Sequence, residues 1–368
     1  MTFRSEDVAD DREPVHRGVP RQFANRIFDG RRWLALLCLG VAPSLSWACA
    51  CGCGMFDVGA NAAFPNMSDS GWSAWFRVNY MNQDKNWEGA SSAPAADNQD
   101  KKIKTWFFTL GGQYMFNNKW GLMVEVPIFD RTFSTTGDGT AFPAGSIGTS
   151  KLTALGDMEI QGIYAGFSPD MSTGVTFGIK LPTGDYTGPY VPPNGLPASN
   201  PNSTTGGHSY DRDSLPGTGS TDLLLGGYHV GGLGSNNRLA YFAQGRYDIA
   251  VFTRDGATGS YRPGSEADVG TGLTYDFGQA GPFSRVAPVL QLLGSWRVRD
   301  SGMAASLNSG YRRLLVAPGV NVRIDKTRIF LDAEVPVLQY VKTDVPASGN
   351  VGQLTAPVIW KFQVAYDF

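Results

Sequence analysis

Apolar residues recur at every second position through most of the chain after residue 71. The first such run is Trp72, Ala74, Phe76, Val78 and Tyr80. Polar residues such as Arg77 and Asn79 stand between its members. A period of two is the pattern of a β-strand with one apolar and one polar face. Similar runs continue to the C-terminus, so we predict an all-β protein with about twelve strands of about ten residues each.

The connections between these predicted strands alternate in length. Long ones fall near 83–101, 131–151 and 184–219, and short ones near 117–119, 166–171 and 231–237. Long loops at one end and tight turns at the other are typical of outer-membrane barrels. An even number of strands also leaves both ends of the barrel on the tight-turn side. A soluble β-sandwich explains the period of two equally well, but it does not explain this alternation.

Aromatic residues gather near the ends of the predicted strands. They are Trp72, Tyr80, Trp106, Tyr114, Phe116, Trp120, Tyr164, Tyr275, Phe277, Trp296 and Trp360. Such positions match the aromatic girdles at the two surfaces of a membrane. We therefore predict a single transmembrane, antiparallel, up-and-down β-barrel over residues 72–368, with outer-membrane lipid as its surroundings. Its last strand ends on Phe368 and resembles the C-terminal signal that the barrel-assembly machinery reads.

The N-terminal residues have the pattern of an export signal. A polar, Arg-rich start precedes the apolar segment 34–41, and Ser46-Trp47-Ala48 follows with small residues around a cleavage point. We predict a cleaved signal peptide over residues 1–48 and a location in the bacterial outer membrane. Two alternatives are a twin-arginine signal, from Arg31-Arg32, and a lipoprotein signal with Cys49 as the lipidated residue.

Charge and composition exclude several functional classes. The chain has 368 residues, with 31 basic and 33 acidic side chains and a net charge of −2. Because no basic stripe is present, we expect no nucleic-acid partner. The chain also has no run of 18 apolar residues, which excludes a bundle of membrane-spanning helices.

The polar face of the predicted strands is strongly charged and points into the lumen of a barrel. Its candidate transport-path residues are Glu125, Asp157, Glu159, Lys180, Arg246, Arg285, Arg297, Arg313, Arg323, Arg328, Asp332 and Glu334. One interpretation is a network of ion pairs that fills and stiffens the barrel. The other is a narrow path between an acidic and a basic ladder. The near balance of the two signs argues against selectivity from a ring of one sign.

The longest connection, 184–219, is rich in Pro, Gly, Asn and Ser. It carries four ring side chains that could form a constriction: Tyr186, Tyr190, His208 and Tyr210. Such a loop either folds into the lumen as a lid or stays on the surface.

A cysteine-rich segment, predicted to be periplasmic, occupies residues 49–71. Cys49, Cys51 and Cys53 stand at alternate positions. Thiolates at this spacing could bind a soft metal ion such as Cu(I). A disulfide is the alternative in an oxidising compartment, and lipidation of Cys49 is a third. Apart from such a metal, we expect no cofactor.

Several short motifs together resemble one known family. They are Leu155-Gly156-Asp157-Met158, Gly178-Ile179-Lys180-Leu181-Pro182-Thr183-Gly184-Asp185, Leu215-Pro216-Gly217-Thr218-Gly219-Ser220-Thr221-Asp222 and Pro318-Gly319-Val320. From about residue 150 onward the chain is similar to the outer-membrane barrels named for the meta-pathway of phenol degradation. This resemblance implies a porin-like, transporter-type barrel that passes hydrophobic or aromatic compounds.

The functional prediction is therefore passive transport of small, hydrophobic or aromatic solutes through an outer-membrane channel. The alternative is a structural or partner-docking barrel whose cysteine segment binds a soft metal or a periplasmic protein. We do not expect an enzyme. Beyond the predicted signal peptide the chain has only His208 and His229 as histidines, and no nucleophile elbow or phosphate-binding loop stands in a helix-opening context.

Overall fold

The computed structural model describes residues 70–136, 145–186, 214–235, 238–256, 259–306, 308–343 and 352–368. The predicted signal peptide and the cysteine segment up to residue 69 lie outside these ranges. The strands of the main sheet are β1 (Gly71–Gln83), β4 (Asp100–Met115), β5 (Trp120–Thr136), β6 (Ile147–Leu155), β7 (Met158–Tyr164), β8 (Thr173–Leu181), β9 (Ser220–Leu233), β10 (Leu239–Thr253), β11 (Glu266–Tyr275), β12 (Arg285–Arg297), β13 (Tyr311–Ile324), β14 (Thr327–Val341) and β16 (Ile359–Asp367).

These strands close into a barrel. Apart from β6 and β7, each strand of this sheet pairs antiparallel with the next one along the chain, and β1 pairs with β16 to complete the ring. β6 and β7 pair with successive parts of β5, so together they occupy one position in the wall. The barrel therefore has twelve strands, as predicted. Closure leaves the hydrogen-bonding groups of the wall paired, which the interior of a bilayer requires.

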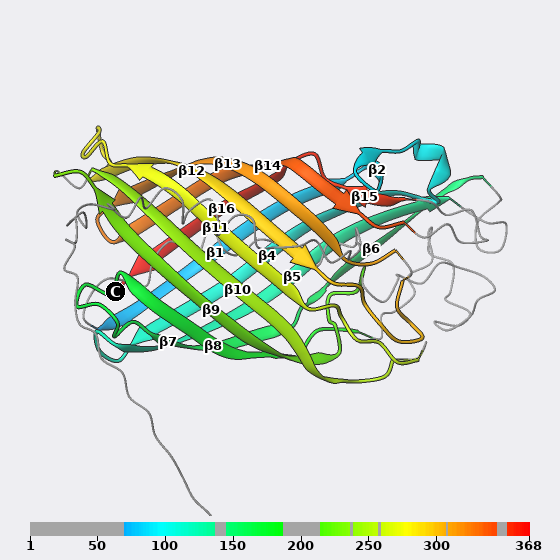
Figure 1. Cartoon of the computed structure of the whole chain (residues 1–368), viewed down its shortest axis with the longest axis horizontal. Helices are drawn as coiled ribbons and strands as arrows, with labels where there is room; N and C mark the ends of the chain where they lie inside the picture. The colour runs from blue at the N-terminus through cyan, green and yellow to red at the C-terminus, as the bar shows by residue number, and fades with distance from the viewer. Residues whose placement is uncertain are drawn as a thin grey trace, which may run out of the picture. The chain divides into compact units, whose positions relative to one another are not determined.

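The two ends of the barrel differ as the alternating loop lengths predict. Short connections at 116–119, 165–172, 234–238, 276–284 and 325–326 lie at the end where the chain terminates. The described strand ends that border the longer connections, such as those of β8 and β14, lie at the opposite end (Figure 1). In outer-membrane barrels the short turns face the periplasm.

One side of the barrel wall extends far beyond the membrane. β5 has 17 residues, which is about 56 Å along the strand at about 3.3 Å per residue and about 40–46 Å along the barrel axis at a tilt of about 35–45°. The apolar band of such barrels is only about 25 Å tall. β6 pairs with the outer part of β5 and with no other strand in the described part of the chain, so it stands as an edge strand above the end of β8.

The connection between β1 and β4 is folded into regular structure. It contains β2 (Lys85–Glu88), β3 (Ser91–Ser92) and the 3-10 helix η1 (Ala95–Asp97). β2 pairs with β15 (Gln353–Thr355), which precedes the last barrel strand. This small sheet lies at the long-loop end (Figure 1), and it ties the first long connection to the last one. Among the described residues, no helix is long and apolar enough to cross a membrane.

The outer surface is apolar and carries the predicted girdles. Trp72 is 58% exposed, whereas Arg77 on the opposite face of β1 is 1% exposed. Near the short-turn end, Trp72 stacks on Tyr114 with ring centroids 4.6 Å apart, and Trp120 stacks on Tyr164 at 4.6 Å. Tyr80 and Trp106 form a similar pair further up the wall, at 4.4 Å. An apolar outer face with such aromatic belts defines an outer-membrane β-barrel.

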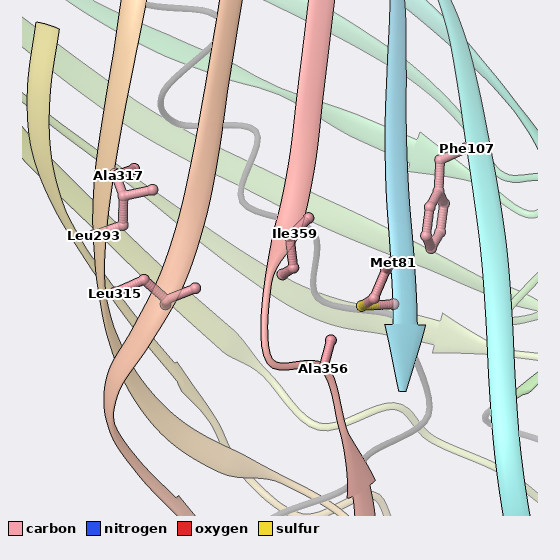
Figure 2. Packing of buried hydrophobic residues seen from close by; sticks show 7 residues of the cluster. All are labelled: Met81, Phe107, Leu293, Leu315, Ala317, Ala356 and Ile359. Atoms are coloured by element: carbon pink, nitrogen blue, oxygen red, sulfur yellow. The ribbon is translucent and has the colours of Figure 1, made fainter. Parts of the chain in front are cut away.

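The interior is a packed core that contains apolar as well as charged layers. Met81, Phe107, Leu293, Leu315, Ala317, Ala356 and Ile359 form one buried cluster, drawn from five strands and the segment before β16 (Figure 2). A second cluster lies near the short turns and includes Trp75, Met115, Met123 and Ile163. The charged inward residues lie between these apolar layers, at the short-turn mouth and toward the long-loop end.

Candidate functional site

The charged inward side chains form ion pairs that cross from strand to strand. On one side, Arg77 of β1 lies 3.2 Å from Glu125 of β5. The Trp75 indole also donates to Glu125, at 3.1 Å. It reaches β5 by passing over Gly111 of the intervening strand, where an added Cβ would lie 1.9 Å from the indole. Glycine at this position therefore allows the contact.

A second network joins β7, β8, β9 and β10. Lys180 lies between two carboxylates, 2.5 Å from Asp222 and 2.9 Å from Asp248. Arg246 binds Glu159 at 2.5 Å and lies 3.8 Å from Asp248. These residues are half-buried or buried, so each charge depends on its partners rather than on bulk water.

A third group lies toward the long-loop end, on β11, β12 and β13. Arg297 lies 2.9 Å from Asp300 and 4.0 Å from Glu266. Tyr311 donates to Glu266 at 2.5 Å. The Arg313 guanidinium lies 3.8 Å from the centre of the Tyr311 ring.

On the wall formed by β12, β14 and β16 the charges are almost completely buried. Glu334 and Lys361 are 2.6 Å apart and their side chains are both 1% exposed. Asp332 accepts a hydrogen bond from Gln291 at 2.8 Å.

The three remaining arginines lie at the short-turn mouth. Arg285 pairs with Asp276 at 2.8 Å, while Arg328 and Arg323 lie 2.8 Å and 3.8 Å from Asp367. Arg285 and Arg323 are 49% and 45% exposed. All twelve predicted residues thus lie on the inner face or at its mouth, but opposite charges are interleaved around the barrel instead of forming an acidic and a basic ladder.

A cavity of about 140 Å³ lies among these networks. On the same measure one water needs only about 10–15 Å³, so the cavity can hold a small organic molecule. One wall is apolar and consists of Phe107, Pro127, Phe129, Leu215 and Pro216. The charged wall includes Glu159, Lys180, Arg246, Asp248, Glu266 and Asp268. β11, which carries Glu266 and Asp268, lies across the barrel from β4 in the strand order, whereas Glu159 on β7 and Lys180 on β8 lie on the side next to β5.

The described end of the longest loop reaches into this cavity. Asp157, at the break between β6 and β7, accepts hydrogen bonds from the backbone NH of Gly184 at 3.0 Å and of Thr218 at 2.7 Å. The Thr218 hydroxyl donates to the same carboxylate at 2.6 Å. Gly217 packs so closely on Gly184 that an added Cβ would lie 2.4 Å from its backbone. One carboxylate therefore holds both ends of the loop against the barrel wall, and we call this contact the loop clamp.

Arg131 is a buried inward residue that the sequence analysis missed. Its side chain donates to Thr105 at 3.0 Å and to the carbonyl of Ser214, and its guanidinium lies over the rings of Phe107 and Phe129. It thereby holds the end of the same loop from the opposite side to the loop clamp. The sequence analysis placed Arg131 in a loop at 131–151, whereas β5 continues to Thr136.

The predicted constriction and metal residues are only partly described. Tyr186 is half-buried just after the loop clamp, while Tyr190, His208 and Tyr210 lie outside the described residues, as do Cys49, Cys51 and Cys53. Within the described ranges, no group of three or more His, Cys, Asp or Glu side chains is arranged to hold a metal ion. His229 lies on the outer wall, where its ring nitrogens contact the hydroxyls of Thr173 at 2.8 Å and Tyr241 at 3.0 Å.

No protein-family model matches the chain, and no curated protein matches it in sequence. Its fold is similar to that of an outer-membrane channel from Pseudomonas putida F1, with a TM-score of 0.56 and 11% identity over 82% of this chain and 96% of that one. The CymD monoaromatic hydrocarbon channel gives a TM-score of 0.41 at 8% identity, covering 85% and 94% of the two chains. A FadL homologue from Pseudomonas aeruginosa gives 0.39 at 11%, covering 88% and 99%. The barrel and its apolar outer belt place the protein in the outer membrane.

Proposed function

We propose that this protein is a passive channel for small, hydrophobic or aromatic solutes. The observation that carries the proposal is the apolar wall of the cavity. Phe107, Phe129 and Leu215 are large apolar side chains on the inner face of a barrel, next to charged groups and open space. A hydrated inorganic ion gains nothing from aromatic rings there, whereas an aromatic solute gains from burial against them.

The proposal includes three points outside the described contacts. Residues 1–48 act as the signal peptide, the Phe368 strand engages the barrel-assembly machinery, and the chain is related to the barrels of the phenol meta-pathway. The loop clamp and Arg131 support a transport role, because both hold the same loop end beside the cavity, where it narrows the path.

Uptake by proteoliposomes tests the function. The folded protein should admit phenyl β-glucoside, which bare bilayers retain, faster than a disaccharide, because its aromatic ring can bind the apolar wall. Phe129→Ser should reduce the rate for phenyl β-glucoside several-fold and leave planar-bilayer ion conductance in place. Phe116→Ser is the matched control, since Phe116 is 57% exposed on the outer surface. Equal rates for phenyl β-glucoside with and without the protein would refute the proposal.

A further inference from the structure

The cavity carries an excess of negative charge, although the chain as a whole is nearly balanced. Its lining residues include six carboxylates: Glu125, Asp157, Glu159, Asp248, Glu266 and Asp268. Only three cationic side chains line it: Arg77, Lys180 and Arg246. Counting the neighbouring charges as well, Asp222 and Asp300 against Arg131, Arg297 and Arg313, leaves an excess of two carboxylates. A cavity of this kind favours a cation over an anion.

Most of these carboxylates are already satisfied within the protein. Glu125, Glu159 and Asp248 have the cationic partners described above, and Asp157 accepts the three hydrogen bonds of the loop clamp. Glu266 accepts from Tyr311 and, at 3.2 Å, from Ser295. The excess charge is therefore not spread evenly over the six groups.

Asp268 is the exception. It is 9% exposed, it lines the cavity, and its Oδ1 is buried without a hydrogen-bond partner. In the sheet it stands between Arg246 and Ser295, and Arg313 follows on the next strand. Ser295 is close enough to hydrogen-bond to this carboxyl group, and the charges of Arg246 and Arg313 attract it, but Arg246 is paired with Glu159 and Arg313 lies over Tyr311. Within the described part of the chain, no cation lies within 4.0 Å of the Asp268 carboxylate.

A buried carboxylate without an ion-pair partner is costly, so it either takes up a proton or pairs with a cation that enters the cavity. We propose that the cavity is a binding site for a small organic cation, an ammonium group joined to an apolar body. The ammonium faces Asp268 with Glu266 and Asp248 nearby, and the apolar body lies against Phe107, Pro127 and Phe129 on the opposite wall. This inference rests on the proposed function and names the charge of the solute that the channel prefers.

The apolar wall contributes by burying solute surface rather than through its ring faces. The Arg131 guanidinium already lies 5.9 Å from the Phe107 ring centre and 5.7 Å from that of Phe129. Its Nη2 is buried without a hydrogen-bond partner, but Arg131 does not line the cavity. Recognition of an anion by Arg131 is therefore the alternative that the experiment must separate.

Three probes of equal ring size separate these possibilities: benzylammonium, benzyl alcohol and benzoate. Equilibrium binding to the folded, detergent-solubilised protein is measured by isothermal titration calorimetry at neutral pH and low salt. We expect benzylammonium to bind about tenfold more tightly than either of the others. Asp268→Asn keeps the shape and removes the charge, and it should abolish most of this preference. Asp97→Asn, in the exposed helix η1, is the matched control and should leave it unchanged.

Binding of benzoate as tight as that of benzylammonium, or no difference among the three probes, would overturn the inference. Binding of the three probes to the wild-type protein tests the inference even if Asp268→Asn does not fold. Uptake of phenyl β-glucoside by proteoliposomes, which bare bilayers retain, reports separately on the channel function. If this uptake depends on the protein but the three probes bind equally well, the channel function stands and the cation site is refuted.

Discussion

Two sets of ion pairs in this barrel use the same residue types but lie in different surroundings. Glu334–Lys361 and Arg77–Glu125 lie inside the wall, with all four side chains no more than 3% exposed. Arg285–Asp276 and Arg323–Asp367 lie at the short-turn mouth, where the arginines are about half exposed. In the interior, loss of one partner leaves a charge that water cannot solvate. At the mouth water replaces the partner, so similar distances correspond to very different energies.

The largest effect is expected from breaking one interior pair. Glu334→Gln removes the carboxylate that lies 2.6 Å from the buried Lys361 ammonium, and we expect a loss of up to about 3–5 kcal/mol of unfolding free energy. Urea unfolding of the lipid-reconstituted barrel, followed by the gel mobility of the folded form, measures this loss. The double variant Glu334→Leu with Lys361→Met removes both charges and should recover most of the stability. If Glu334→Gln alone were as stable as the wild type, interior ion pairs would contribute no more to stability than those at the mouth.

An intermediate effect is expected at the loop clamp, where an interior carboxylate is held by hydrogen bonds instead of a cation. Asp157→Asn weakens three charge-assisted hydrogen bonds, each worth about 1.5–3 kcal/mol. The expected result is a freed loop, seen as faster proteolysis between residues 184 and 218 and as larger fluctuations of the single-channel current. Thr218→Val removes only the hydroxyl contact and should produce a smaller change of the same kind. Unchanged proteolysis in Asp157→Asn would show that other contacts hold the loop.

The smallest effect is expected at the mouth. Arg285→Met breaks the pair with Asp276 in a half-exposed setting, and we expect a change of less than about 1 kcal/mol. The same urea experiment measures it, and added salt should reduce even this difference. If Arg285→Met lost as much unfolding free energy as Glu334→Gln, burial would not explain the difference between the interior and mouth ion pairs.

The strand count, the alternation of connections and the inward phase of the charged residues could be predicted from the sequence. The outer half of β5 could not. Within the membrane its outward residues are apolar, as at Val124 and Val126, but further on Asp130 and Thr132 face outward while Phe129 and Phe133 face inward. The polarity pattern inverts where the strand leaves the bilayer, because water replaces lipid outside and packed side chains fill the lumen. The prediction therefore ended the strand too early and missed Arg131.

The site itself was predicted only in part. Glu125, Asp157, Glu159, Lys180 and Arg246 do line one cavity, as their shared face suggested. Asp268 also lay on the predicted polar face, but nothing in its spacing distinguished it from the carboxylates that have partners. Its lack of a partner follows from the engagement of Arg246 by Glu159, a residue far away in the chain.

By itself the sequence determined that this protein is an outer-membrane barrel. The period of two is a local property of extended backbone, and a bilayer requires apolar side chains outside and a closed sheet around them. Only the tertiary structure decided which charges meet. Lys180 forms ion pairs with both Asp222 and Asp248, whereas Asp268 has no ion-pair partner in the described structure. Ion pairing depends on strand register and on which strands face each other across the lumen. The alternation of residues along one strand predicts neither the register nor the strands that face each other. The acidity of the cavity therefore becomes apparent only in the closed barrel.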